Sequence, residues 1–248
     1  MASPSRRTRV VPIRPKHAPR QTPIHPFDCL HGTETSGLIP RAALVTGHPS
    51  DVHVTAYYGV APSILNSLLD VWLGTKPLPV ERYTFLDVGA GKGRATLVAA
   101  QTPFLQVCGV ELNPALAALA RANVAAFAQS PQANQLAPIE ILEGDALEVP
   151  LPPAPLVAFL FHPFEAPLLR RFLARIAQQY AHSSVDILYV NAEHAAVIDH
   201  NPAFRRVFYG MIPMSSEDHL ADLAEIAEQT EYGSTGDELC AIYRLDPA

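Results

Sequence analysis

The sequence is poor in cysteine, and it lacks the long apolar runs that membrane spans require. Three cysteines occur in 248 residues, without a CxxC pair. This usage argues against a disulfide framework and against a structural zinc site, and it fits a reducing compartment. No uninterrupted apolar run approaches the roughly 18 residues needed to cross a bilayer, and the N-terminus lacks the apolar stretch of a secretory signal. We expect a cytoplasmic protein with no membrane partner and with Cys108 and Cys240 in its core.

Basic residues are scarce beyond the first 20 residues. That segment holds six of the 18 Lys and Arg residues and no acid, so the rest of the chain carries 12 basic and 24 acidic residues, a formal charge of −12. A body this acidic repels a phosphate backbone, which disfavours nucleic acid as a partner. Prolines in the same segment frustrate regular structure. We therefore expect residues 1–26 to form a disordered basic arm, with an organellar presequence as the alternative.

Short apolar runs alternate with segments of helical spacing along the rest of the chain. An amphipathic helix is predicted over 62–74. Buried strands are predicted at 83–88, 107–111, 139–142, 155–161 and 185–190, and two closing strands at 204–209 and 239–245. The pattern predicts a doubly wound, Rossmann-like α/β sheet that is mostly parallel with an antiparallel finish. We expect residues 27–80 to cover the site and residues 81–248 to form the main domain.

The strongest local signal is a glycine-rich turn, Asp87-Val88-Gly89-Ala90-Gly91-Lys92-Gly93-Arg94, between a predicted strand and a helix. Glycines there let the backbone turn tightly and approach a ligand, with free helix N–H groups facing the cleft. A dinucleotide fingerprint fails because Arg94 stands where a small residue is required. A phosphate-binding P-loop also fails, because Lys92 lacks the spacing from a first Gly and no Ser or Thr follows it.

Three acids follow three neighbouring strands. Asp87 ends the first strand, Glu111 ends the second, and Asp145 lies just beyond the third. In an open parallel sheet these strand ends line one crevice. Three carboxylates repel a pyrophosphate and suit a ligand with a ribose diol, an adenine amino group and a positive charge. The alternative for Asp87 or Glu111 alone is a carboxylate that caps a turn at the end of a strand.

The motifs FLDVGAGKGR, GVELNP, EGDA and FHPF resemble those of the class I S-adenosylmethionine-dependent methyltransferases, over roughly Asp51 to Leu245. The segments LDVGAGKGR, GVELNPAL and LFHPF, together with TAYYGVAPS upstream, are similar to uncharacterised bacterial methyltransferases that distantly resemble the Dot1-type protein lysine methyltransferases. The resemblance implies a seven-stranded sheet with an antiparallel last strand, S-adenosylmethionine as cofactor, and methyl transfer to an acceptor that is a small molecule or a protein. The alternatives are a non-catalytic module that binds this cofactor and an NAD-dependent oxidoreductase.

The resemblance also implies roles for individual residues in holding the cofactor. Glu111 would accept hydrogen bonds from the ribose hydroxyls, and Asp87 would organise the loop or face the ammonium group. The other implied contacts are Gly89, Ala90, Gly91 and Gly93 beneath the methionyl part, Asp145 at the adenine amino group, and Ala146 through its backbone N–H. Upstream, we expect Thr55 and Tyr58 to fold over the carboxylate end, with packing as the alternative.

The acceptor side is predicted at the end of the fourth strand, where related enzymes often carry Asn or Asp. Here the residue is His162, whose neutral imidazole can act as a general base. Phe164 offers an aromatic wall for a cation–π contact with the sulfonium methyl group. The alternatives are a loop histidine and a core aromatic residue.

Two further segments carry charged or metal-binding side chains in patterns that favour structural roles. The acids of a helix predicted at 216–228 indicate a solvated face, with docking of a basic partner as the alternative. His25, Cys29 and His31 cluster without a fourth ligand, so we expect no metal site.

Overall fold

The computed structural model describes residues 24–75, 78–131, 136–163, 165–226 and 236–246. Most of the predicted arm at 1–26 lies outside these ranges. The α-helices are α1 (Pro26–His31), α2 (Pro62–Thr75), α3 (Arg94–Ala99), α4 (Pro114–Phe127), α5 (Ala166–Gln179), α6 (Ala195–Asp199) and α7 (Ser216–Ile226). Short 3₁₀ helices cover Arg41–Ala43, Pro49–His53 and Val80–Arg82. The strands are β1 (Thr84–Val88), β2 (Gln106–Glu111), β3 (Ile139–Glu143), β4 (Leu156–Phe161), β5 (Val185–Val190), β6 (Phe204–Ile212) and β7 (Glu238–Leu245).

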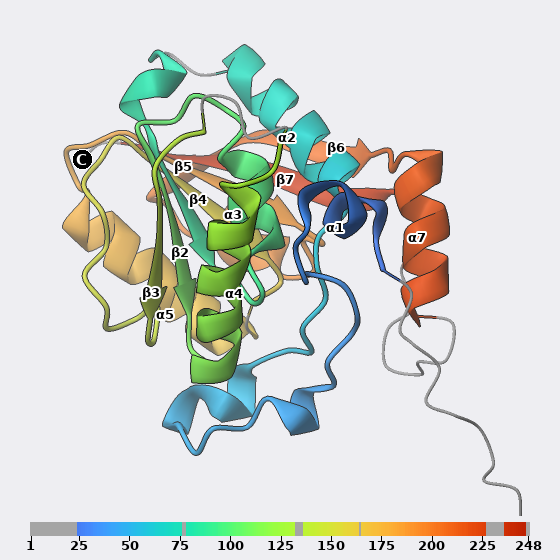
Figure 1. The fold of residues 1–248 in the computed structure, drawn as a ribbon. Coiled ribbons are helices and arrows are strands. Elements are labelled where there is room, and N and C mark those ends of the chain that lie inside the picture. The colour runs from blue at the N-terminus through green and yellow to red at the C-terminus, as the bar shows by residue number, and fades with distance from the viewer. Residues whose placement is uncertain (1–23, 76–77, 132–135, 164, 227–235, 247–248) are drawn as a thin grey trace, which may run out of the picture.

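The strands form one seven-stranded sheet in the order β3-β2-β1-β4-β5-β7-β6 (Figure 1). The five strands from β3 to β5 are parallel, and β7 runs antiparallel to both of its neighbours, β5 and β6. The predicted α/β fold with an antiparallel last strand is confirmed. Strand order reverses between β1 and β4, and ligands of open parallel sheets bind beside such a reversal, at the carboxyl ends of the strands.

Alternating side chains of the central strands divide the core into two clusters. Phe85 of β1 packs with Trp72 of α2 and Leu97 of α3 on one face of the sheet. Leu86 of the same strand packs with Phe172 of α5 on the other face. This alternation follows from the two-residue period of a strand, and helices on both faces are what buries a parallel sheet completely.

Local signals in the sequence fix the start of α4. The side chain of Asn113 accepts hydrogen bonds from the backbone N–H groups of Ala115 and Leu116, and Pro114 occupies the first helical turn. The Asn side chain accepts hydrogen bonds from N–H groups that have no partner within the helix. Proline lacks an N–H group, but no hydrogen bond within the helix requires one in the first turn. Because α4 follows β2 directly, this cap also fixes the carboxyl end of β2, where Glu111 lies.

The helix α7 corrects the prediction of a solvated acidic face. Asp218, Asp222 and Glu225 are buried, whereas Leu220 is 67% exposed. The three acids recur at the spacing of one helical face. That face meets polar partners from distant segments, so the usual rule that the apolar face turns inward does not hold for this helix.

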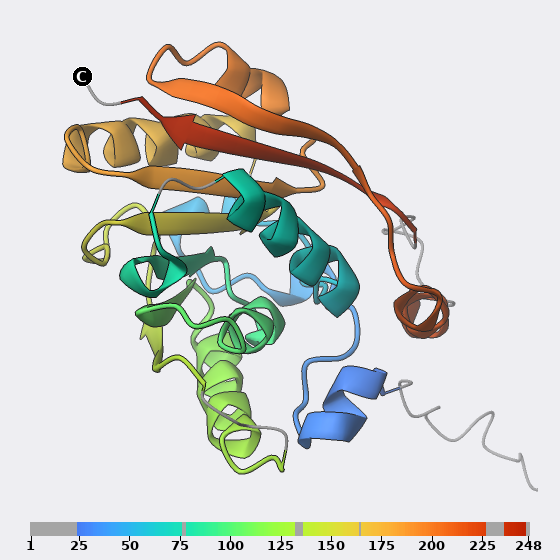
Figure 2. The same ribbon diagram turned by 90° about the horizontal axis from the view of Figure 1, so that it is seen from above.

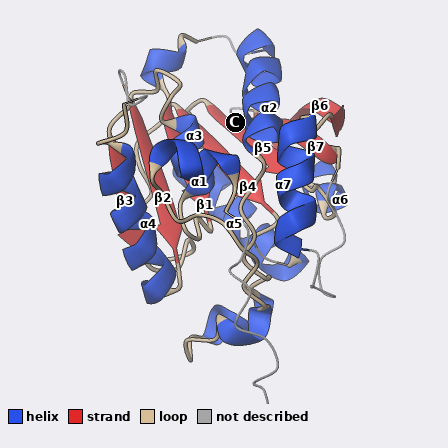
Figure 3. Ribbon diagram, turned by 45° about the vertical axis from the view of Figure 1, so that its right-hand side comes forward, coloured by secondary structure: helices blue, strands red, loops and turns tan. Residues whose placement is uncertain are grey.

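Each of these partners is a hydrogen-bond donor or a cation. Asp218 accepts a hydrogen bond from the backbone N–H of Ser63 at 2.8 Å, and Glu225 accepts one from the backbone N–H of Gly37 at 2.9 Å. Glu225 also lies 3.5 Å from the buried Arg94 guanidinium. Figure 2 shows the long β6 and β7 strands reaching past the sheet to α7, and Figure 3 shows α7 close to α1.

None of the helices in the described ranges is long and apolar enough to traverse a lipid bilayer.

The burial of Glu225 predicts a large loss of stability for Glu225→Ala. Removing one partner of a buried ion pair leaves the other charge uncompensated, so we expect the free energy of unfolding to fall by about 3–5 kcal/mol. Chemical denaturation measures this change. Glu217→Ala, which removes an exposed acid of the same helix, is the matched control and should change stability by less than about 0.5 kcal/mol. Equal effects of the two substitutions would contradict the buried pair.

Candidate functional site

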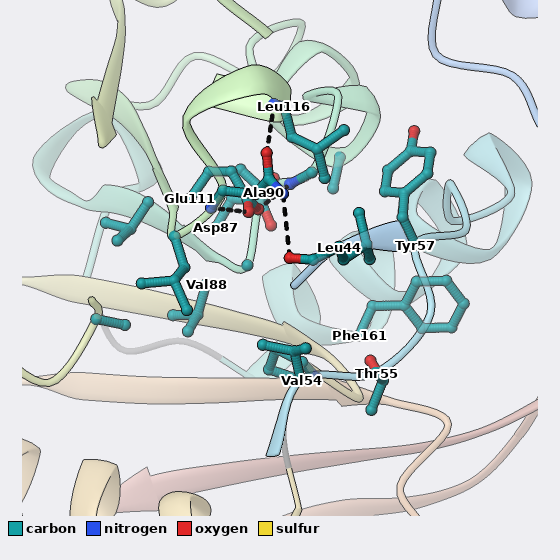
Figure 4. Close-up of a pocket in the computed structure, with 18 of the residues that line it drawn as sticks. Leu44, Val54, Thr55, Tyr57, Asp87, Val88, Ala90, Glu111, Leu116 and Phe161 are labelled. Atoms are coloured by element: carbon teal, nitrogen blue, oxygen red, sulfur yellow. Dashed lines mark hydrogen bonds between the residues drawn. The ribbon is translucent and has the colours of Figure 1, made fainter. Parts of the chain in front are cut away.

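A cavity opens at the carboxyl ends of β1, β2, β3 and β4 (Figure 4). Its empty volume, including the mouth, is about 1040 Å³. The walls come from the sheet edge, from the glycine-rich turn after β1, and from the segment before α2, which contributes Leu44, Ser50 and residues 54–60. Segments far apart in the sequence therefore enclose one site, and the residues upstream of α2 form its cover.

The glycine-rich turn depends on a close approach between Gly91 and Tyr57. The backbone of Gly91 is left-handed, with φ of 56°, and a Cβ atom there would lie 2.3 Å from the Tyr57 ring. Gly89 and Gly93 also have positive φ. Tyr57 is held over the turn because its hydroxyl donates a hydrogen bond to the carbonyl oxygen of Thr35 at 2.6 Å. The cover and the turn are thus fitted to each other.

Glu111 links β2 to the same turn. One carboxylate oxygen accepts a hydrogen bond from the backbone N–H of Gly91 at 2.7 Å, and the other accepts one from the backbone N–H of Asn113 at 2.7 Å. Burial raises the pKa of Glu111, and these backbone hydrogen bonds oppose the shift. The carboxylate is therefore fixed in place, and it lines the cavity.

Asp87 is the most deeply buried of the three predicted acids. Its carboxylate accepts a hydrogen bond from the Thr96 hydroxyl at 2.7 Å. Burial raises the pKa of Asp87 to about 7, the Thr96 hydrogen bond opposes this shift, and the charge of Glu111 adds to it. Two neighbouring carboxylates in a poorly solvated wall favour a proton or a cation beside them.

Asp145 completes the acidic lining from the end of β3. One oxygen accepts a hydrogen bond from the backbone N–H of Leu147, and the other accepts one from the Ser50 hydroxyl, both at 2.7 Å. Ala146 lines the cavity beside it. The Ser50 contact joins the cover to the sheet edge, so the structure brings all three predicted acids together around one cavity.

The two predicted cover residues, Thr55 and Tyr58, both line the cavity. The Thr55 hydroxyl donates a hydrogen bond to the carbonyl oxygen of His162 at 2.9 Å. Burial raises the pKa of Tyr58, and the nearby Asp222 carboxylate adds to this shift. Tyr58 therefore stays neutral and lies between the cavity and α7.

The predicted acceptor residues are placed differently. His162 does not line the cavity; its Nε2 atom lies 3.7 Å from the Glu193 carboxylate, and its ring centroid lies 5.1 Å from that of His194. Burial lowers the pKa of His162, whereas Glu193 opposes the shift. Phe164 lies outside the described residues. Gly93 is also not part of the lining, although it is the N-cap residue of α3.

Arg94 is a cavity residue that no sequence motif assigned to the site. It is 1% exposed, and its guanidinium donates hydrogen bonds to the Thr35 hydroxyl at 2.8 Å and to the carbonyl oxygen of Gly59 at 3.3 Å. With Glu225 these partners come from three separate segments, so no local pattern could have revealed them. Within the described lining, Arg94 is the basic side chain.

The described residues contain no group of three or more His, Cys, Asp or Glu side chains arranged to hold a metal ion. The His25 Nδ1 atom accepts a hydrogen bond from the backbone N–H of Phe27, and its Nε2 atom lies 3.5 Å from Asp218. Cys29 is exposed. His25 therefore serves the junction between α1 and α7.

Residues 85–183 match the model of a family described as a methyltransferase domain. No curated protein matches the sequence. Among solved structures, the chain is similar to the magnesium protoporphyrin IX methyltransferase of Synechocystis with bound S-adenosylmethionine, at 13% identity and a TM-score of 0.48, over 75% of this chain and 79% of that one. It is also similar to an RNA methyltransferase of Salinibacter ruber in complex with S-adenosyl-L-homocysteine, at 17% identity and a TM-score of 0.44, over 76% and 92% of the two chains. The matched domain includes the glycine-rich turn and all three acids.

The fit between Gly91 and Tyr57 predicts that Gly91→Ala destabilises the fold. A Cβ atom in a left-handed position together with a clash against a packed ring should lower the free energy of unfolding by about 2–4 kcal/mol. Chemical denaturation measures the loss. Gly74→Ala is the control, because Gly74 lies in α2 with open space around it, and alanine there should raise stability by up to about 1 kcal/mol. A neutral Gly91→Ala would contradict the described turn.

Proposed function

We propose that this chain, a methyltransferase that uses S-adenosylmethionine, binds its cofactor in the cavity described above and transfers the methyl group to a protein side chain or a small molecule. The observation that carries the proposal is the convergence of Asp87, Glu111 and Asp145 on one cavity beside a glycine-rich turn. The domain match supports it, because that domain contains these residues.

The charges of the cavity suit the cofactor. We assign the ribose hydroxyls to Glu111, the adenine amino group to the Asp145 carboxylate, an adenine ring nitrogen to the Ala146 N–H, and the ammonium group to Asp87. A carboxylate has about four acceptor positions, so Glu111 can accept hydroxyl hydrogens while it holds Gly91 and Asn113. The positive charge of Arg94 favours the carboxylate of the methionyl part. The turn has no side chain longer than a methyl group at Gly89, Ala90, Gly91 and Gly93.

When bound, the cofactor would supply a methyl group attached to a positively charged sulfur. The sulfur would leave as the acceptor atom attacks the methyl carbon in line. The protein contributes orientation and the exclusion of water. Tyr57 packs with Leu44 and Leu116 above the turn, and this apolar cover shields the reacting atoms. Thr55 and Tyr58 complete the cover on the side of β4 and α7.

The net charge of the chain and two of its sequence segments limit the chemical class of the acceptor. The net charge of −6 disfavours a nucleic acid acceptor through repulsion of its phosphates. The resemblance of the TAYYGVAPS and LFHPF segments to bacterial methyltransferases that are distantly similar to the Dot1-type group supports a protein side chain as the acceptor. A small molecule is the alternative. His162 and Phe164 stay predicted residues of the acceptor side.

Two experiments test the proposal directly. Calorimetry with the full-length protein should show heat with S-adenosylmethionine and with S-adenosylhomocysteine, and none with NAD. Incubation with the cofactor labelled in its methyl group and a cell lysate should place label in the protein fraction or the small-molecule fraction. Binding without any transfer of label would favour the non-catalytic module, and binding of NAD alone would favour the oxidoreductase.

Glu111→Gln should weaken cofactor binding by about 10–100-fold, because it removes the charge from a hydrogen-bonded acceptor. Calorimetry measures the dissociation constant, and thermal unfolding checks that the variant is folded. The matched control is Glu140→Gln, since Glu140 is an exposed acid of the adjacent strand β3. An unchanged dissociation constant for Glu111→Gln would refute the assignment of the ribose to this residue.

The raised pKa of Asp87 predicts that cofactor binding releases protons. With a pKa of about 7, Asp87 is mostly protonated at pH 6.5 before binding. An adjacent ammonium group favours the carboxylate and lowers this pKa, so the proton leaves on binding. Calorimetry at pH 6.5 in buffers of different ionisation enthalpy measures the release. Asp87→Asn should abolish most of it. Proton uptake by the unmodified chain would show the opposite linkage.

A further inference from the structure

The carboxyl ends of β4 and β5 carry an unusual pair of backbone conformations. His162 and Asn191 have φ of 44° and 48°, and they are the non-glycine residues with positive φ in the described ranges. The register pairs Phe161 with Val190, so the two residues follow a matched pair and lie side by side. Left-handed conformations are uncommon outside glycine and concentrate at functional sites.

A chain of polar contacts connects the two residues. The Asn191 side-chain amide donates a hydrogen bond to one oxygen of the Glu193 carboxylate at 3.5 Å. The other oxygen of Glu193 lies 3.7 Å from the His162 Nε2 atom. The His194 ring adjoins that of His162, with 5.1 Å between their centroids. The left-handed turns therefore direct two side chains toward one carboxylate.

This group lies directly beside the cofactor cavity. Phe161 and Pro163, the neighbours of His162 in the chain, both line the cavity. A Cβ atom on Gly89 would lie 2.9 Å from the Pro163 Cβ atom, so the turn after β4 touches the glycine-rich turn. The Thr55 hydroxyl also holds the carbonyl oxygen of His162 from the cover side. An acceptor that reaches this group is thus next to the bound cofactor.

We propose that Asn191 and Glu193 complete an acceptor site around His162, and that this site takes a nucleophile that carries a proton. The assignment rests on the proposed function. Glu193, 59% exposed in its side chain, is placed to meet an incoming acceptor and to hold the imidazole. Asn191 positions the Glu193 carboxylate. An acceptor atom that already has a free lone pair, such as a thioether sulfur, needs no such pair of groups.

The chemistry balances without a further reactant. The acceptor atom gives its proton to Nε2 of His162, and its lone pair forms a bond to the methyl carbon. The carbon–sulfur bond breaks, and its electron pair goes to sulfur, which becomes neutral. The imidazolium beside Glu193 then returns its proton to solvent. Nε2 is the nitrogen that faces Glu193, whereas Nδ1 is buried without a hydrogen-bond partner among the described residues.

The ionisation of His162 depends on several neighbours. Burial favours the neutral imidazole and lowers the pKa, and the positive charge of a protonated His194 acts in the same direction. The carboxylates of Glu193 and Glu165 oppose the shift. Removing the charge of Glu193 should therefore lower the pKa of His162 further, so that the base form persists to lower pH.

The experiment measures transfer from methyl-labelled S-adenosylmethionine into a cell lysate by the full-length chain at saturating cofactor. We expect Glu193→Gln and His162→Ala each to reduce the rate by about 100-fold or more, while calorimetry shows cofactor dissociation constants within twofold of the unmodified chain. Asn191→Gly, which keeps the left-handed backbone, should reduce the rate less. Glu193→Asp should restore part of it, and Glu140→Gln is the control without effect.

The pH profile distinguishes this role from a merely structural one. The acidic limb of the rate should move to lower pH in Glu193→Gln and disappear in His162→Ala. An unchanged rate in Glu193→Gln, or a loss of cofactor affinity that parallels the loss of rate, overturns the acceptor site while the proposed function stands. Binding without transfer by the unmodified chain overturns the proposed function itself, and the inference with it.

Discussion

The burial of carboxylates beside the glycine-rich turn is the constraint on which the site depends. Asp87 and Glu111 end adjacent strands, and both are withdrawn from water in the wall of one cavity. Charged groups in such surroundings require hydrogen bonds, a proton or a counter-charge. Thr96 and the N–H groups of Gly91 and Asn113 supply part of this stabilisation. The stabilisation that these groups do not supply has to come from a ligand. This favours a ligand with hydroxyl hydrogens and positive charge, which a diphosphate cannot provide.

The cover depends on a second buried charge. Arg94, which follows the glycine-rich turn, contacts Thr35, Gly59 and Glu225, so the segment before α2 and the helix α7 are both fixed to that turn. Asp28 strengthens the same junction, because its carboxylate accepts hydrogen bonds from the backbone N–H and the hydroxyl of Thr35. Stability of the cover and geometry of the cavity therefore rest on shared contacts.

Much of the fold could be predicted because its signals are local. The strand β5 has the predicted bounds, 185–190, since a short run of apolar residues records burial on both faces of a sheet. The Asn113 cap is visible in the sequence for a similar reason, because a capping side chain and its N–H partners are neighbours in the chain. The three acids could be placed at one edge because parallel strands end there together.

Other features could not be predicted because their partners lie far away in the chain. The inward acids of α7 look like a solvated face until Arg94 and the N–H groups of Ser63 and Gly37 are placed against them. Arg94 contacts residues 59 positions before it and 131 positions after it. The direction of the His162 side chain likewise could not be predicted from the sequence, because a left-handed turn at a non-glycine residue follows from tertiary packing.

The central claim is that the acidic cavity holds an adenosyl ligand. A crystal structure of the full chain grown with S-adenosylhomocysteine tests it most directly. We expect density for the ligand in this cavity, with the ribose hydroxyls on the Glu111 carboxylate and the adenine amino group on Asp145. Density for the ligand at another place, or an adenosine that leaves both carboxylates untouched, would contradict the account.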